Sequence, residues 1–186
     1  MGAIRALLLA ASQNRWLRER ASQYKFVKRS VSRFMPGETL DDAIAAVRDL
    51  KRNNIAAVLT HLGENIFDKQ EAESVAMHYQ LVLERIRAEN LDAEISVKLT
   101  QLGLDLSPEL CEQNLRRLLS TENPLRTVWI DTEASSYVEA TLGIYTRLLA
   151  DYPNAGICLQ AYLHRTAADV DALRQMKPTI RLVKGA

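Results

Sequence analysis

Five short apolar segments, separated by stretches with helical periodicity, limit what this chain can fold into. Each segment has the length and apolar content of a buried strand. The stretches between them leave room for one helix and two short loops, as a crossover between parallel strands requires. A series of such units predicts an α/β fold with a parallel sheet. The predicted strands are 55–62, 94–99, 127–131, 156–161 and 179–183.

The stretches around these strands carry signals for helix starts. Thr39 and Asp42 resemble a capping box with Asp in place of Glu, at the start of a helix that precedes the first strand. Ser107 and Pro108 supply an N-cap and a proline at the first helical position. We interpret 166–169, Thr-Ala-Ala-Asp, as the cap of the last helix. The predicted helices are 39–53, 68–89, 107–120, 135–150 and 166–176.

The first 38 residues differ in charge from the rest of the chain. They carry eight Lys and Arg against two Glu, a net charge of +6, which leaves −5 for the remainder. Residues 15–34 place apolar side chains at helical spacing with basic residues between them, which predicts a basic amphipathic helix. This helix either packs on the domain with a solvated basic face or contacts an anionic membrane surface. Residues 35–38 predict a linker, so we divide the chain into a basic helical arm with its linker, 1–38, and an α/β domain, 39–186.

The composition argues against several classes of protein. The net charge of +1 gives no reason to expect a nucleic-acid partner. Cys111 and Cys158 cannot form a disulfide framework, which favours a reducing compartment, and they lack the spacing of a metal site. No apolar run is long enough to cross a bilayer. We therefore expect a cytoplasmic protein, peripheral to the inner membrane if the basic helix binds it, and rank a mitochondrial location second.

Polar side chains gather on one face of the predicted sheet. Alternation along the strands puts aliphatic residues on the other face and Lys98, Asp131, Gln160 and Arg181 on this one, each toward the carboxyl end of its strand. In a (β/α)8 barrel the inward residues at that end form the active site. A doubly wound sheet has helices on both faces and little use for four polar residues on one of them. The pattern therefore favours a barrel of the TIM type.

Some of these residues also have a purely structural interpretation. Lys98 and Asp131, on neighbouring strands, could form a buried ion pair that sets the register. Gln160 could instead satisfy the backbone of a loop. As a site, the four residues supply cations, a carboxylate and an amide, but no catalytic Ser or Cys. His61 and His164 are not spaced as a metal pair, and we expect them in loop or capping roles.

Five motifs stand in order along these strands and their loops: Leu62-Gly63-Glu64-Asn65, Ser96-Val97-Lys98-Leu99, Ile130-Asp131-Thr132-Glu133, Leu159-Gln160-Ala161-Tyr162 and Arg181-Leu182-Val183-Lys184-Gly185-Ala186. Their spacing resembles that of the proline dehydrogenase family, flavoenzymes built on a (β/α)8 barrel. The resemblance implies FAD as the cofactor, L-proline as the substrate and Δ1-pyrroline-5-carboxylate as the product. It also implies that a quinone or another membrane electron acceptor takes the electrons.

The resemblance further implies a role for each matched residue. Asp131 and Arg181 match catalytic residues, with Arg181 near the reactive flavin nitrogen. Lys98 matches a lysine that binds the substrate carboxylate, and Glu64 matches a loop acid that closes over the substrate. No metal ligand is implied. The residues that match cofactor-binding positions are Thr132, Gln160, Lys184, Gly185 and Ala186.

The family pattern extends beyond the fifth strand. It continues through three more strands and a final helix, whose two arginines and tyrosine hold the substrate. We therefore expect this chain to form the first five-eighths of the barrel and to be inactive alone. Two alternatives remain: a Schiff-base (β/α)8 enzyme such as an aldolase, with Lys98 or Lys184 as nucleophile, or a non-catalytic fragment whose barrel is completed by a partner.

Overall fold

The computed structural model describes residues 37, 39–63, 66–121 and 126–185. It divides into two compact units, residues 1–46 and 47–186. The basic amphipathic helix predicted at 15–34 lies outside the described residues. The linker predicted at 35–38 does too, apart from Gly37, so the domain boundary that we placed after residue 38 stays a prediction.

All five predicted strands form, as do all five helices predicted from residue 39 onward. The strands are β1 (Ala57–Thr60), β2 (Ala93–Val97), β3 (Val128–Ile130), β4 (Ala155–Gln160) and β5 (Thr179–Val183). The α-helices are α4 (Leu40–Arg52), α5 (Lys69–Ala88), α6 (Pro108–Leu119), α7 (Val138–Leu149) and α8 (Thr166–Leu173). Short 3₁₀ turns accompany them: η1 (Thr100–Leu102), η2 (Ser135–Tyr137) and η3 (Arg174–Met176).

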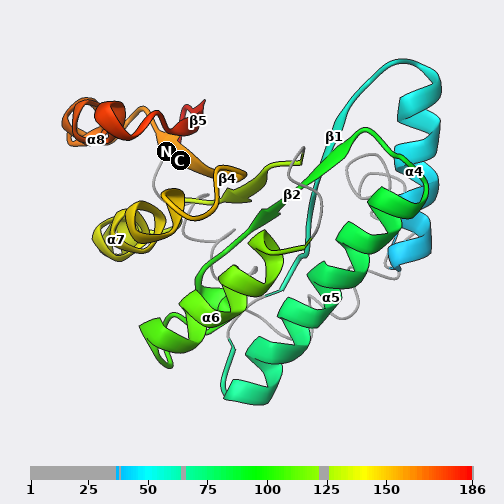
Figure 1. The fold of residues 1–186 in the computed structure, drawn as a ribbon, viewed down its shortest axis with the longest axis horizontal. Helices are drawn as coiled ribbons and strands as arrows, with labels where there is room; N and C mark the ends of the chain where they lie inside the picture. The colour runs from blue at the N-terminus through cyan, green and yellow to red at the C-terminus, as the bar shows by residue number, and fades with distance from the viewer. Residues whose placement is uncertain (1–36, 38, 64–65, 122–125, 186) are drawn as a thin grey trace, which may run out of the picture. The chain divides into compact units, whose positions relative to one another are not determined.

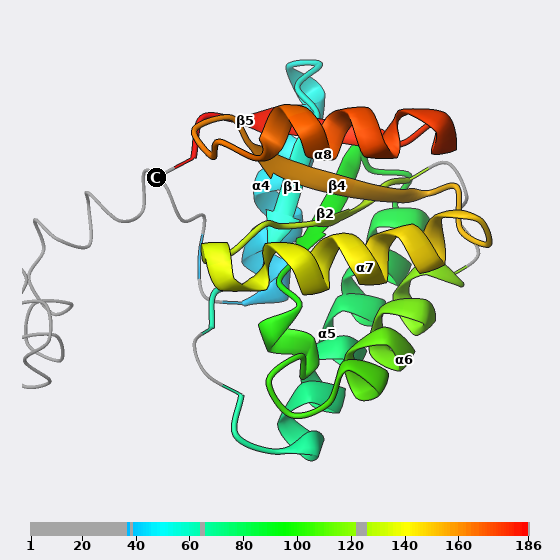
Figure 2. The ribbon, with the colours of Figure 1, turned by 90° about the vertical axis from the view of Figure 1, so that its left-hand side faces the viewer.

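The sheet settles the choice between the two parallel architectures. Its strand order is β1-β2-β3-β4-β5, and every neighbouring pair is parallel. A doubly wound sheet reverses its strand order at a switch point, and this order has no reversal. Figure 1 and the rotated view in Figure 2 show α5, α6, α7 and α8 following one another on the same side of the sheet. Strand order and helix placement are those of consecutive units of a (β/α)8 barrel.

The hydrophobic core lies between the sheet and these helices. Tyr79 of α5, Leu115 of α6 and Leu148 of α7 are each at most 1% exposed. Burying an aliphatic or aromatic side chain of this size contributes roughly 1.5–3 kcal/mol, so this layer holds the sheet in place. In β5, Leu182 is 61% exposed. The core-facing residues of β2, β3 and β4 are at most 3% exposed: Ala93, Ile95, Val97, Val128, Ile130, Ala155, Ile157 and Leu159. The polar residues of the strands are therefore left on the opposite face.

Two of the predicted helix caps are confirmed. The hydroxyl of Thr39 accepts a hydrogen bond from the N–H of Asp42, and the Asp42 carboxylate accepts one from the N–H of Thr39, which is a reciprocal capping box. Ser107 accepts from the N–H of Leu110, with Pro108 at the first helical position. Each cap satisfies backbone donors that the first turn of a helix leaves without an intrahelical acceptor.

The cap predicted for α8 is wrong. Arg165 occupies the N-cap position, and no side chain caps the helix there. The hydroxyl of Thr166 instead donates to the carbonyl of Gln160 (2.6 Å), and the carboxylate of Asp169 pairs with Arg165 (2.8 Å). Both side chains have stronger partners nearby than the helix backbone, which is why the sequence pattern misleads.

Among the described residues, no helix combines the length and the apolar character needed to cross a membrane.

Candidate active site

Three of the polar residues singled out in the sequence lie at the carboxyl ends of consecutive strands, and the fourth, Arg181, lies further back in its strand. Lys98 directly follows β2, and Gln160 is the last residue of β4. Asp131 extends β3 by one residue, since its N–H donates to the carbonyl of Val97 (2.9 Å). Arg181 lies in the middle of β5, in register with Cys158 of β4. The four side chains come from four strands of one sheet face, as predicted.

Arg181 and Asp131 form an ion pair that crosses over β4. The Nη2 atom of Arg181 lies 2.6 Å from Oδ1 of Asp131, and their side chains are 29% and 24% exposed. Ser96 of β2 joins them: its hydroxyl donates to the same carboxylate oxygen (2.7 Å) and accepts from Arg181 Nη2 (2.9 Å). Cys158 lies on the intervening strand, and its short side chain leaves room for the long arginine to pass. The three residues form one connected cluster across β2, β3 and β5.

Trp129 lies on the same face of the sheet as this cluster, two residues before Asp131 along the chain. The guanidinium carbon of Arg181 lies 5.0 Å from the centre of the Trp129 ring, a cation–π distance. The indole N–H donates to the carboxylate of Glu94 on β2 (2.6 Å). Ser96 and Trp129 lie on the predicted polar face, but their contacts with Arg181 are seen only in the folded structure.

Lys98 has no ion pair with any residue that the structure describes. The ion pair between Lys98 and Asp131, considered above as a structural alternative, does not form, because Asp131 accepts from Arg181 and Ser96 instead. The side chain of Lys98 is half-buried. A half-buried ammonium without a counter-ion is a candidate for binding an anionic ligand.

Gln160 and Thr132 support the loops that follow β3 and β4. The Nε2 of Gln160 donates to the carbonyl of Thr132 (3.1 Å), and the hydroxyl of Thr132 donates to the carbonyl of Cys158. The structural interpretation of Gln160, as a group that satisfies loop backbone, therefore holds for its amide N–H. Its carbonyl oxygen forms no hydrogen bond with a described residue and leaves an acceptor for a ligand.

The end of β5 turns sharply at Gly185, where φ is +89°. A Cβ on this residue would lie 2.1 Å from Cδ1 of Tyr162, so only glycine fits. The N–H of Tyr162 donates to the carbonyl of Lys184 (3.0 Å), and the Lys184 side chain is exposed. Tyr162 therefore accounts for the glycine within this structure, a contact that sequence reasoning missed. Glu64 and Ala186 lie outside the described residues.

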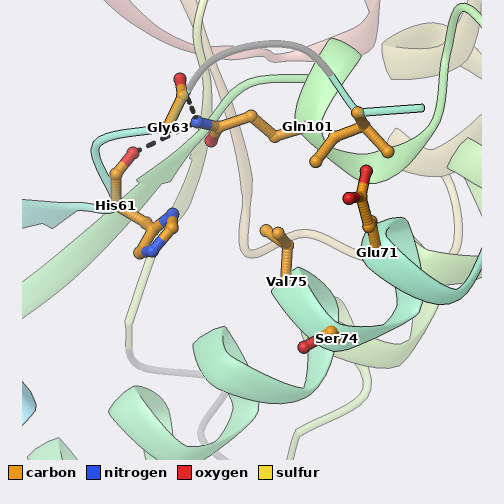
Figure 3. Close-up of a pocket in the computed structure, with 7 residues that line it drawn as sticks. His61, Gly63, Glu71, Ser74, Val75 and Gln101 are labelled. Carbon is orange, nitrogen blue, oxygen red and sulfur yellow. Dashed lines mark hydrogen bonds between the residues drawn. The ribbon is translucent and has the colours of Figure 1, made fainter. Parts of the chain in front are cut away.

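A pocket of about 280 Å³ opens beside the loop that follows β1 (Figure 3). Gln101 of η1, which is 3% exposed, donates to the carbonyls of His61 (3.3 Å) and Gly63 (2.9 Å) and so holds this loop. The hydroxyl of Tyr79 accepts from the N–H of His61 (2.9 Å), and burial raises the Tyr79 pKa. Burial, reinforced by the neighbouring His61 ring, lowers the pKa of His78. His61 thus has the predicted loop role, and no cluster suited to a metal exists among the described residues.

One buried donor in the Arg181 cluster has no partner among the described residues. The Nε atom of Arg181 is buried and forms no hydrogen bond with a described residue. A buried N–H left unpaired costs free energy. The Nη1 atom of Arg181 also forms no hydrogen bond with a described residue and is not buried, so it is the donor that a ligand can reach. Together with Lys98 and the amide oxygen of Gln160, the cluster offers cations and one acceptor at the carboxyl ends of the strands. In a (β/α)8 barrel this edge of the sheet is where ligands bind.

The fold places the protein in the class of (β/α)8-type α/β proteins, with charged residues gathered toward the carboxyl ends of its strands. The family model for proline dehydrogenase matches residues 43–186. The chain belongs to the proline dehydrogenase family.

Relatives are similar to the chain in sequence, and a solved structure is similar to it in fold. The chain is 38% identical over 184 residues to proline dehydrogenase 1 of Bacillus subtilis (strain 168), covering 98% of this chain and 61% of that relative. It is 31% identical over 160 residues to proline dehydrogenase of Deinococcus radiodurans, covering 83% of this chain and 52% of the relative. Its fold is similar to that of proline utilization A from Bdellovibrio bacteriovorus inactivated by N-propargylglycine, with a TM-score of 0.74 at 24% identity, over 86% of this chain and 20% of that one. The chain thus spans about three-fifths of the length of its Bacillus relative.

Proposed function

We propose that this chain supplies the substrate and flavin contacts of a proline dehydrogenase, which oxidises L-proline to Δ1-pyrroline-5-carboxylate. One observation carries the proposal: in a chain of this family, Asp131 and Arg181 pair at the carboxyl face of the sheet and leave Arg181 Nη1 without an acceptor among the described residues. Membership in the family supports this proposal over the Schiff-base alternative. The remaining alternative, a non-catalytic fragment, is tested by the experiment below.

Lys98 binds the carboxylate of the substrate in this proposal. Its ammonium is half-buried and lacks a counter-ion among the described residues, so a bound carboxylate would complete its electrostatics. The proposed role of Glu64 is to close the loop after β1 over the substrate and exclude water.

Arg181 provides a fixed positive charge for the transfer. Asp131 and Ser96 hold its Nη2, and Nη1, which has no acceptor among the described residues, can donate to a bound acceptor. A guanidinium stays charged at any working pH, and a charge fixed before the reaction stabilises negative charge that develops during it. Asp131 therefore acts as the group that orients Arg181.

The residues fit FAD in their donor and acceptor chemistry. FAD, when bound, accepts the hydride that proline loses on oxidation. The Nη1 group of Arg181 and the amide oxygen of Gln160, neither hydrogen-bonded to a described residue, match a ring system that carries both acceptors and a donor. The residues that would hold it are Thr132, Gln160, Arg181, Lys184, Gly185 and Ala186. The electrons would pass to a quinone or another membrane acceptor, and the protein would be cytoplasmic with peripheral contact to the inner membrane.

The test uses the protein expressed over its full reading frame, beside the 186-residue chain. Anaerobic addition of L-proline should bleach the absorption of bound flavin, and o-aminobenzaldehyde should trap the product, while D-proline should do neither. We expect the 186-residue chain alone to be inactive. A full-length protein that binds no flavin, or whose flavin is not reduced by L-proline, would refute the proposal and favour the non-catalytic alternative.

A further inference from the structure

The indole of Trp129 lies between two charged residues that come from different strands. On one side Arg181 of β5 packs its guanidinium against the ring, with 5.0 Å between the guanidinium carbon and the ring centre. On the other side Glu94 of β2 accepts from the indole N–H at 2.6 Å. We propose that Trp129 and Glu94 are positioning residues that set the orientation of the Arg181 guanidinium. The inference rests on the proposed function only for what Arg181 then does.

Arg181 needs such support because its other contacts fix a single atom. Both Asp131 and Ser96 bind Nη2, so the guanidinium could still turn about that point. The face of Trp129 removes this freedom, since a guanidinium stacks flat on an aromatic ring. Contact with the ring thus sets the direction of the Nη1 donors, which have no acceptor among the described residues and are left for a ligand.

Glu94 holds the indole of Trp129 in place by accepting two hydrogen bonds, one from β3 and one from the residue that precedes β3. Its carboxylate accepts from the indole N–H of Trp129 and from the backbone N–H of Thr127 (3.3 Å). Both hydrogen bonds run from the β3 segment to β2, so Glu94 ties the ring to a strand that the core holds in place. A carboxylate with two N–H donors is satisfied without a cation, which leaves Arg181 free to pair with Asp131.

Gly156 of β4 makes room for this arrangement. It is in register with Trp129, and a Cβ built on it would lie 2.7 Å from Cε3 of the indole. The ring therefore lies against the glycine backbone, in space that any other residue would fill. Trp129 is also only half-buried and faces away from the hydrophobic core, so filling the core does not explain it. Residues from four strands, β2 to β5, thus set the position of the Arg181 side chain.

The first arm of the test needs no cofactor. The chain has two tryptophans, and Trp16→Phe leaves Trp129 as the only one. In that background, Arg181→Ala and Glu94→Gln should each increase the quenching of Trp129 fluorescence by acrylamide. Glu94→Gln acts because its amide nitrogen is a donor, so either Thr127 or the indole loses its acceptor. Lys177→Ala, in an exposed turn, is the control and should leave quenching unchanged.

The second arm uses the flavin-loaded protein expressed over its full reading frame. Arg181→Met and Trp129→Leu should both lower the reduction potential of the flavin, and the double variant should lie no lower than Arg181→Met. Trp129→Phe keeps an aromatic face and should restore most of the potential. If Trp129→Leu does not fold, Gly156→Ala and Glu94→Gln displace the ring by smaller changes and should lower the potential in the same direction.

The outcomes separate this inference from the proposed function. If the wild-type protein binds no flavin, the proposed function fails, and the quenching experiment alone decides whether Trp129 and Arg181 are in contact. Unchanged quenching in Arg181→Ala overturns the inference in either case. A wild-type potential in the Trp129→Leu and Gly156→Ala proteins, or a full additional loss in the Arg181→Met background, overturns it while leaving the proposed function standing.

Discussion

Arg181 and Asp131 meet at 2.6 Å although β4 separates their strands. Neither side chain is more than 29% exposed, so the pair is shielded from solvent on most sides. Removing one partner of a shielded pair leaves the other with an uncompensated charge, which costs more than the net contribution of the intact pair. This relationship links the stability of the sheet to the geometry of the candidate active site.

Asp131→Asn should therefore lower the free energy of unfolding by about 1–3 kcal/mol. The asparagine keeps the shape and one acceptor oxygen, so the loss measures the charge and not a cavity. Urea unfolding followed by circular dichroism would measure it. Asp151→Asn is the matched control, because Asp151 pairs with Arg116 at 3.3 Å while 63% exposed. Exposed pairs contribute little, and a loss above about 1 kcal/mol in this control would contradict the argument from shielding.

The face that carries these residues could be predicted from strand alternation, whereas their partners could not. Alternation places Asp131 and Arg181 on one face, and the structure confirms it. It also places Lys98 beside Asp131, yet Asp131 pairs with Arg181, two strands away. The pairing of Asp131 with Arg181 depends on the small side chain of Cys158 and on the length of arginine, and no local sequence pattern predicts it. The cap of α8 failed for the same reason, since Arg165 competes for Asp169.

If the proposed function holds, Lys98→Met should raise the KM for L-proline in the protein expressed over its full reading frame. Loss of a charge-assisted hydrogen bond of roughly 1.5–3 kcal/mol corresponds to a KM increase of roughly 10- to 150-fold. The flavin content should not change, because no described residue depends on the Lys98 side chain. Lys69→Met is the control, since Lys69 is 71% exposed on α5 and pairs only loosely with Glu73 at 3.7 Å. Equal KM values for wild type and Lys98→Met would remove Lys98 from the substrate site.

Cys111 should make the protein less stable as the pH rises above 9. Burial raises the pKa of its thiol from 9.0 to about 12 in the folded state. The unfolded chain therefore releases this proton first, and stability that is complete below pH 9 is lost as the pH rises through the folded pKa. Between pH 9 and 10 the loss should be about 1 kcal/mol for this one group.

The measurement compares the wild type with Cys111→Ala in urea at each pH. The variant starts from a lower stability because it loses buried volume, but its slope between pH 9 and 10 should be shallower by that amount. The same burial, at 0% exposure, should keep Cys111 unreactive toward thiol reagents at pH 8 until the protein unfolds. Parallel slopes in the two proteins would show that the Cys111 thiol does not control this pH dependence.

Gly185→Ala should destabilise the protein through two separable effects. The residue has φ of +89°, a conformation that strains any residue with a Cβ, and the added methyl group would meet Cδ1 of Tyr162 at 2.1 Å. Together we expect a loss of roughly 1–3 kcal/mol in the free energy of unfolding. In the double variant Gly185→Ala with Tyr162→Ser the clash is absent, so part of the lost stability should return while the strain remains.

Gly143→Ala in α7 is the control and should stabilise by up to about 1 kcal/mol, since its nearest neighbour would be the Arg147 side chain at 3.5 Å. If Gly185→Ala costs as much stability in the Tyr162→Ser background as it does in the wild type, the contact with Tyr162 does not contribute to the loss. The space beside Gly185 would then be open to a ligand.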